Sequence, residues 1–145
     1  MQLLIVKSYK HMGKKMAATG NMMPEIMARH ATCKPVVARL GNKCFKKTAV
    51  ARDSKLMVAS SLMLSRELFG AGAWPSLTTT EAARSHSNVM GIFRIALSES
   101  WAARQNPDGT STMLSDRELI RVHELMAPST YVRFSRLRLS IRVVN

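Results

Sequence analysis

Histidine and cysteine are the residues of this sequence that could bind a metal or act as nucleophiles. His30 and Cys33 lie three positions apart, so on a helix their side chains would fall on adjacent turns and could reach one ion. Cys44 follows eleven positions after Cys33, about three helical turns, and shares the same face. Small buried side chains on a core-facing stripe have this spacing as well. We favour the core interpretation, and the sequence predicts neither a metal site nor a cofactor.

The other candidates for catalysis have no partner at a useful spacing. Asp53, Asp108 and Asp116 are widely separated in the sequence, so no two of them form the carboxylate pair that holds catalytic metal ions. The sequence contains no P-loop, no G-x-S-x-G motif and no H-E-x-x-H motif. The histidines are scattered as well. We therefore expect no enzymatic activity from these residues alone.

Charge is the strongest compositional signal. The 145 residues carry a net charge of +13, and the isoelectric point is near 10.8. A protein this basic attracts polyanions, with nucleic acid first and an anionic membrane surface second. Every lysine lies at or before Lys55, and the residues up to that point include 12 basic and 2 acidic ones. The rest of the chain has 10 arginines and 7 acidic residues, so the first part carries most of the long-range field.

The sequence gives no sign of a membrane or a secretory route. No stretch approaches the ~18 apolar residues of a transmembrane helix. The opening "MQLLIVKSYK" is a poor signal peptide. Two cysteines are too few for a disulfide framework. We expect an intracellular protein, nuclear or cytoplasmic, with no membrane partner.

The pattern of apolar residues predicts a mainly α fold of one structural domain. Residues 1–20 are expected to form a short β-hairpin, with Tyr9 in its first arm and Gly13 at the turn. Residues 21–145 are expected to form about five helices in an irregular bundle. Pro35 should kink or split the first of these helices. The helices are expected over 24–47, 54–69, 78–97 and 115–126, followed by a final segment.

Local signals predict how these helices begin and which one is central. Thr78 with Glu81 and Ser115 with Glu118 have the spacing of capping boxes. Asp53 is placed to cap the helix over 54–69. That helix is apolar nearly all round, which is typical of a central, buried helix.

The stretch "LFGAGAWPSLT" predicts the end of a helix, followed by a tryptophan that packs against it. Gly70 can adopt the left-handed conformation that ends helices. The small residues Ala71, Gly72 and Ala73 allow a neighbouring backbone to approach closely. Trp74 is expected to pack at the helix junction, and stacking on a nucleic-acid base is the alternative.

The final segment, residues 131–144, can be interpreted in two ways. Polar and apolar residues alternate from Arg136 to Val143, which slightly favours a strand. Phe134, Leu137, Ile141 and Val144 also give a helical stripe.

Two groups of basic residues are candidates for nucleic-acid contact. The first gathers away from the apolar face of the helix over 24–47, and the second lies in the final segment. Neither has the interleaved aromatics of a single-strand stacking platform, so we expect backbone-directed binding without sequence preference. An ordinary solvated face is the alternative for the first group. The candidates are Lys10, Arg39, Lys43, Lys46, Lys47, Arg133, Arg136 and Arg138.

Taken in order, several motifs resemble those of one protein family. The family is the non-LTR (LINE-type) retrotransposon reverse transcriptases, in the region that follows the catalytic palm. "VKSYKHMG" resembles the family's Tyr-Lys-Tyr-Leu-Gly element, and "SRELFGAGAW" resembles a helix ending in Leu-Leu-Tyr-Gly-Ala-Glu-x-Trp. "RFSRLRLSIRVV" resembles the arginine-rich segment near the family's end. "PEIMARHATCKPVVARLGNKCF", "VMGIFRIAL" and "SDRELI" resemble the blocks that lie between these motifs.

The resemblance implies the thumb and connection region of an RNA-directed DNA polymerase. In the family, the catalytic aspartates precede the Tyr-Lys-x-x-Gly element, so the resemblance implies a fragment that is not an enzyme on its own. It also implies a template–primer duplex as partner, together with the rest of the polymerase, and it favours a helix for the final segment. Three positions depart from the family pattern: Glu67 replaces an apolar residue, Phe69 a tyrosine and Gly72 a glutamate.

Two other interpretations remain open at this point. One is a translated structural remnant with no independent function. The other is an unrelated small basic RNA-binding or ribosome-associated protein. The order of the motifs favours the polymerase fragment or the remnant.

Overall fold

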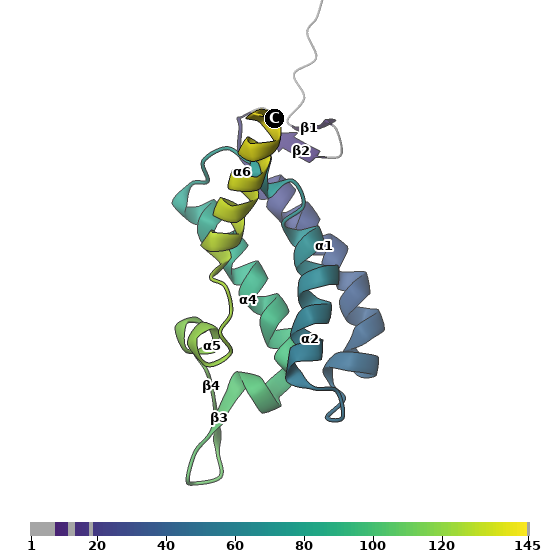
Figure 1. Ribbon diagram of the computed structural model, residues 1–145, viewed down its shortest axis with the longest axis vertical. Coiled ribbons are helices and arrows are strands. Elements are labelled where there is room, and N and C mark those ends of the chain that lie inside the picture. Colours follow the sequence, from purple (N-terminus) through teal and green to yellow (C-terminus); the bar gives the residue numbers. More distant parts are fainter. Residues whose placement is uncertain (1–7, 12–13, 18, 145) are drawn as a thin grey trace, which may run out of the picture.

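The chain forms a bundle of helices with a small β-hairpin near each end of the molecule (Figure 1). The structure is a computed structural model, and it describes residues 8–11, 14–17 and 19–144. The predicted mainly α fold with an N-terminal hairpin is confirmed. The elements are β1 (Ser8–His11), β2 (Lys14–Ala17), α1 (Met23–Leu40), the π-helix η1 (Gly41–Phe45), α2 (Arg52–Ala59), the π-helix η2 (Ser60–Leu64), α3 (Ser65–Glu67), the 3₁₀-helix η3 (Ala71–Ala73), α4 (Thr79–Ala102), β3 (Ala103–Gln105), β4 (Ser111–Met113), α5 (Asp116–Val122) and α6 (Pro128–Val144).

The N-terminal hairpin has the expected antiparallel pairing. Ser8 is opposite Ala17, and His11 is opposite Lys14, across the β1–β2 pair. The predictions on Gly13 and on the side chains of Tyr9 and Lys10 lie outside what the structure describes. The second hairpin, β3–β4, lies where the sequence suggested only a turn-rich loop.

The first helix is not split at Pro35, so the split that the sequence allowed beside a kink does not occur. Helix α1 runs from Met23 to Leu40 with Pro35 inside it, on the exposed side. A proline removes one backbone hydrogen bond, and tertiary packing of the opposite face outweighs that loss here. Cys33 and Ile26 on that face are 1% and 0% exposed.

The central helix of the bundle is α4, and the prediction that residues 54–69 would fill this role is wrong. In α4, Val89, Met90 and Phe93 are at most 1% exposed. In the continuous helical run from α2 to α3, Met57 and Leu62 are exposed instead. Helix α4 packs against α1 and α2 on one side and against α6 on the other (Figure 1). Neighbouring helices cover only one side of the α2–α3 run, so its other apolar residues face outward.

The helix stop at Gly70 forms as predicted. Gly70 adopts the left-handed conformation, with φ +72°, and η3 follows directly. Trp74 is 4% exposed and packs against Met22, Ile26 and Ala71. The packing interpretation of Trp74 is therefore confirmed.

Close approach of a neighbouring backbone occurs at Gly72. A Cβ atom added to Gly72 would lie 2.6 Å from the carbonyl oxygen of Ser135, a residue of α6. The final segment is thus a helix, as the family resemblance favoured, and it lies directly on η3.

The caps of the later helices also form, whereas the predicted cap at Asp53 does not. Ser115 and Glu118 make a complete capping box at the start of α5, and Thr78 and Glu81 bond reciprocally at the start of α4. Helix α2 begins at Arg52, ahead of Asp53, whose carboxylate accepts a hydrogen bond from Arg52. Within the described residues, no helix combines the length and apolar character needed to cross a membrane.

Candidate nucleic-acid interface

The first group of predicted basic residues lies together at the end of α1. Arg39 occupies the last turn of α1, Lys43 lies within η1, and Lys46 and Lys47 follow it. All four side chains are exposed. Phe45, in the same short segment, is 1% exposed, and its burial fixes η1 against the bundle. We call Arg39, Lys43, Lys46 and Lys47 the lysine end.

The charges of the lysine end are not neutralised within the protein. In the part of the chain that the structure describes, none of these four side chains forms an ion pair with a carboxylate. Lysine carries a compact charge on a flexible stem. The lysine end therefore presents a cluster of mobile positive charges to solvent.

The second group, on α6, is divided between two sides of that helix. Arg133 and Arg136 line a cavity of about 680 Å³ between α4 and α6, together with His86 and Ser129. Arg138 lines a different cavity of about 440 Å³ beside η3, and its guanidinium lies 5.9 Å from the centre of the Phe134 ring. Positions 133 and 136 are one turn apart, whereas position 138 falls on another face. We call the cavity between α4 and α6 the arginine groove.

Arg136 is held by backbone carbonyls at the edge of the arginine groove. Its Nη2 donates to the carbonyl oxygen of Pro75 at 2.8 Å and to that of Trp74 at 3.4 Å. Arg133 is exposed. Among the described residues, no aspartate or glutamate lines this groove.

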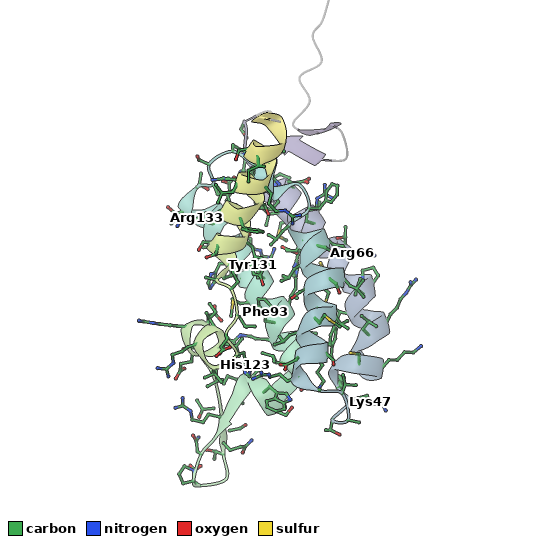
Figure 2. The ribbon with its side chains drawn as sticks, viewed as in Figure 1. Lys47, Arg66, Phe93, His123, Tyr131 and Arg133 are labelled. Atoms are coloured by element: carbon green, nitrogen blue, oxygen red, sulfur yellow. The ribbon has the colours of Figure 1, made fainter. Side chains whose placement is uncertain are left out.

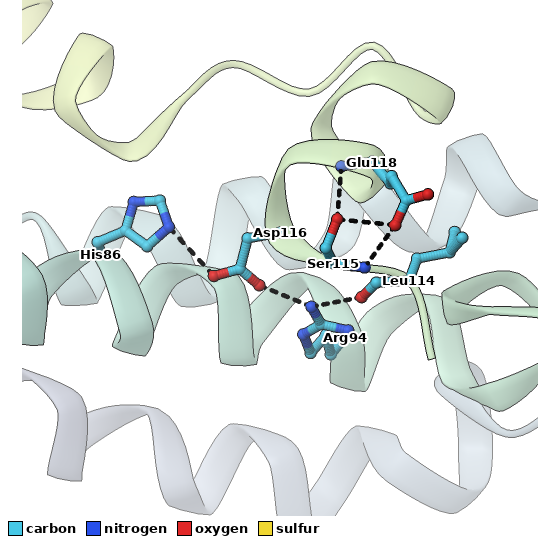
Figure 3. A network of polar contacts seen from close by, with 6 residues as sticks. All are labelled: His86, Arg94, Leu114, Ser115, Asp116 and Glu118. Atoms are coloured by element: carbon cyan, nitrogen blue, oxygen red, sulfur yellow. Dashed lines mark hydrogen bonds and ion pairs between the residues drawn. The ribbon is translucent and has the colours of Figure 1, made fainter. Parts of the chain in front are cut away.

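His86 is part of a polar network beside the arginine groove (Figure 3). No spacing pattern in the sequence distinguishes it from the other histidines. Its Nε2 lies 3.2 Å from a carboxylate oxygen of Asp116. The other oxygen of Asp116 accepts from Arg94 at 2.6 Å, and Arg94 also donates to the carbonyl of Leu114. The hydrogen bond from Arg94 is the main cause that lowers the pKa of Asp116 below its ordinary value of 3.8. Asp116 is therefore a stable anion that orients the imidazole of His86.

His30 and Cys33, considered above as a metal-binding pair, both turn toward Glu67. The Glu67 carboxylate is buried and accepts from Asn88 at 2.9 Å. It also lies 3.1 Å from His30 Nδ1 and 3.8 Å from Cys33 Sγ. Burial, reinforced by the charge of Glu67, raises the pKa of Cys33 to about 11. The thiol is thus protonated at neutral pH, which makes it a poor nucleophile and a poor metal ligand.

The lysine end and the arginine groove lie on different sides of the bundle. Figure 2 shows Lys47 at the lower right and Arg133 at the upper left, with Phe93 of the core between them. The predicted residues whose side chains the structure describes therefore form no continuous surface: they divide between the lysine end, the arginine groove and the position of Arg138 beside η3.

Two positions at which the sequence departs from the reverse-transcriptase motifs that it resembles make specific contacts. Glu67 joins α1 and α4 through its three partners, and Gly72 allows α6 to approach η3.

Comparison of the chain with protein-family models, curated proteins and solved structures finds no match.

Proposed function

We propose that this chain binds a nucleic-acid duplex through its backbone phosphates, without preference for sequence. The observation that carries the proposal is the lysine end, where four exposed cations gather at the end of one helix without a neutralising carboxylate in the described structure. Release of condensed counterions from the duplex supplies the driving force for such binding.

The arrangement of exposed aromatic residues supports contact with the backbone rather than with bases. The Phe69 ring lies 4.8 Å below the guanidinium of Arg29, and the Phe134 ring lies beneath Arg138. Trp74 is buried and faces the core. A platform that stacks bases would need free aromatic faces beside the cations. The remaining exposed aromatic side chain in the described part of the chain, Trp101, belongs to α4 and not to the segment of the lysine end.

The duplex of this proposal is a template–primer, and the chain acts as a thumb-like part of an RNA-directed DNA polymerase. The order of the sequence motifs supports this identification, and a helical bundle is compatible with it. The chain itself contributes binding and no catalytic step. In this proposal, the palm and fingers of the polymerase are the protein partner.

The experiment is a binding titration of the purified chain against a fluorescent RNA–DNA duplex, repeated between about 50 and about 200 mM salt. We expect a linear log–log dependence of affinity on salt, with a slope that grows by about 0.9 for each phosphate neutralised. A duplex of scrambled sequence should bind equally well. Absence of binding at low salt would favour the structural remnant, and strong preference for one sequence would favour the unrelated RNA-binding protein.

A further inference from the structure

The arginine groove differs from the lysine end because two of its polar side chains, Arg136 and His86, are already held in place. Three separate segments build it: the loop before α4, the first turns of α4, and the first turns of α6. Leu77, Ala83 and Val132 form part of its wall. An anion in such a groove is partly shielded from water, and its attraction to a cation is stronger than on an open surface.

We propose that the arginine groove seats one backbone phosphate of the bound duplex, with Arg133, Arg136 and His86 as its ligands. This inference rests on the proposed function, because it assigns the place where that duplex is fixed. The lysine end attracts the duplex, and the groove sets its position.

Arg136 is suited to this role because its guanidinium is fixed before any ligand arrives. Nη2 is used for the carbonyl oxygens of Pro75 and Trp74, whereas a guanidinium has five N–H donors in total. The remaining donors can face a phosphate, and little side-chain freedom is lost when they bind. Arg133, one turn earlier on the same face, adds a second fork without an internal ion pair among the described residues.

His86 completes the site from the opposite wall. Asp116 holds its Nε2, so Nδ1 is the nitrogen left for a ligand. As a ligand of the phosphate, the imidazole would donate from Nδ1 while Nε2 donates to Asp116. The charged groups around it are Asp116 and Arg94 on the network side and Arg133 and Arg136 across the groove.

The cavity of about 660 Å³ at the other end of α4 is a weaker candidate for a phosphate. Lys46 and Arg94 line it, together with Phe45, Ile95 and Met113. Arg94 already donates to Asp116 and to a backbone carbonyl. Its charge is thus neutralised inside the protein, in contrast to the charges of Arg133 and Arg136.

The test measures duplex binding by the full chain carrying Arg133→Gln or His86→Gln. The matched control is Arg84→Gln, which removes an exposed arginine from α4 that does not line the groove. We expect Arg133→Gln to reduce the salt slope by about 0.9, the value for one duplex phosphate, and Arg84→Gln to leave it unchanged. We expect His86→Gln to weaken duplex binding relative to the wild type at a fixed pH, and Arg84→Gln to leave the affinity unchanged.

The outcomes separate this inference from the proposed function. If the wild type binds the duplex while Arg133→Gln and Arg84→Gln behave alike, the groove assignment is wrong and the function stands. If the wild type does not bind the duplex at all, both are wrong. In a further arm, inorganic phosphate should compete no better than chloride at equal ionic strength. Stronger competition by phosphate that Arg133→Gln removes would identify a free-phosphate site and overturn the assignment to the duplex backbone.

Discussion

The lysine end and the arginine groove are both basic, but they are built in opposite ways. The lysine end comes from a single stretch of chain between Arg39 and Lys47, and its side chains have no fixed partners among the described residues. The groove combines segments more than 40 residues apart. Its Arg136 is held by the carbonyl oxygen of Pro75, and its His86 is held by the carboxylate of Asp116. Local sequence is enough to create an electrostatic field, whereas tertiary structure is needed to aim a donor.

The difference predicts distinct contributions to binding. Flexible lysines attract a polyanion over a long range and lose that effect as salt screens them. Anchored arginines act only at contact, through directed hydrogen bonds that fix the ligand. Changes that disturb the packing of α6 should therefore affect the groove and spare the lysine end.

The largest effect is expected for Trp74→Ala, which removes the aromatic ring beneath the groove's edge. The ring is buried against Met22, Ile26 and Ala71, so its loss should lower the free energy of unfolding by about 3–5 kcal/mol. Denaturant unfolding followed by circular dichroism measures this change without relying on the fluorescence of Trp101. A midpoint that hardly moves, combined with weaker duplex binding, would mean that Trp74 stacks on a base.

Gly72→Ala tests the contact between η3 and α6 more selectively. The new Cβ would meet the carbonyl oxygen of Ser135 at 2.6 Å, and moving α6 away should cost about 1–3 kcal/mol. The contribution of Arg133 to duplex binding should weaken at the same time. Denaturation and salt titration of the same sample measure both effects.

Gly91→Ala is the control for this substitution. Gly91 lies inside α4, and an added Cβ would meet nothing within 4 Å. Alanine should there stabilise the helix by roughly 0.5–1 kcal/mol. Equal destabilisation by both substitutions would show that α6 is not held by the close approach at Gly72.

Replacing Lys43, Lys46 and Lys47 together by alanine tests the lysine end. Because each lost phosphate contact removes about one unit, the log–log salt slope should flatten by roughly two to three units. Folding stability should stay the same, since all three side chains are exposed. A suitable control replaces the exposed arginines Arg84, Arg117 and Arg121, which removes the same charge elsewhere. An unchanged slope in the lysine variant would mean that this end points away from the nucleic acid.

The features predicted correctly from the sequence are those with a local cause. The two capping boxes depend on residues three positions apart, and the helix stop depends on the left-handed preference of Gly70. The mainly α fold follows from apolar periodicity in the same way. The lysine end belongs to this class too, because its four residues lie within nine consecutive positions at the end of α1, in η1 and directly after it.

The features that were missed depend on which elements become neighbours. An apolar circumference suggested that residues 54–69 form the central helix, yet Met57 lies 68% exposed because α4 takes that position. Likewise, no local pattern pairs His86 with Asp116, 30 positions later. Asp53 failed as a cap because the helix starts at Arg52, two residues before the predicted start at Ser54, so Asp53 lies inside the first turn. The sequence therefore could not predict the groove, although it did single out Arg133 and Arg136 as candidates for nucleic-acid contact.

The smallest effect is expected for Glu81→Gln, at the base of the loop that forms one side of the groove. The Glu81 carboxylate accepts from the backbone N–H of Thr78 at 2.8 Å and from that of Met22 at 2.6 Å, so it ties the start of α4 to the start of α1. The hydrogen bond from Thr78 is the main cause that lowers the pKa of Glu81 below its ordinary value of 4.5, and the bond from Met22 lowers it further. Glutamine at this position should lower the free energy of unfolding by about 1 kcal/mol at neutral pH, which is the usual contribution of a helix cap.

The pH dependence gives this prediction its sign. A carboxylate with a lowered pKa stabilises the fold above its unfolded-state pKa, and that contribution is lost as the pH falls through its folded-state pKa. The wild type and Glu81→Gln should thus converge in denaturation midpoint between pH about 5 and about 3. Glu118→Gln is the control, because Glu118 caps its own helix through Ser115 and otherwise pairs only with the exposed Arg104 at 3.3 Å among the described residues, and it should produce a smaller gap. A gap for Glu81→Gln that stays constant with pH would show that the charge of Glu81 does not hold the two helix starts together.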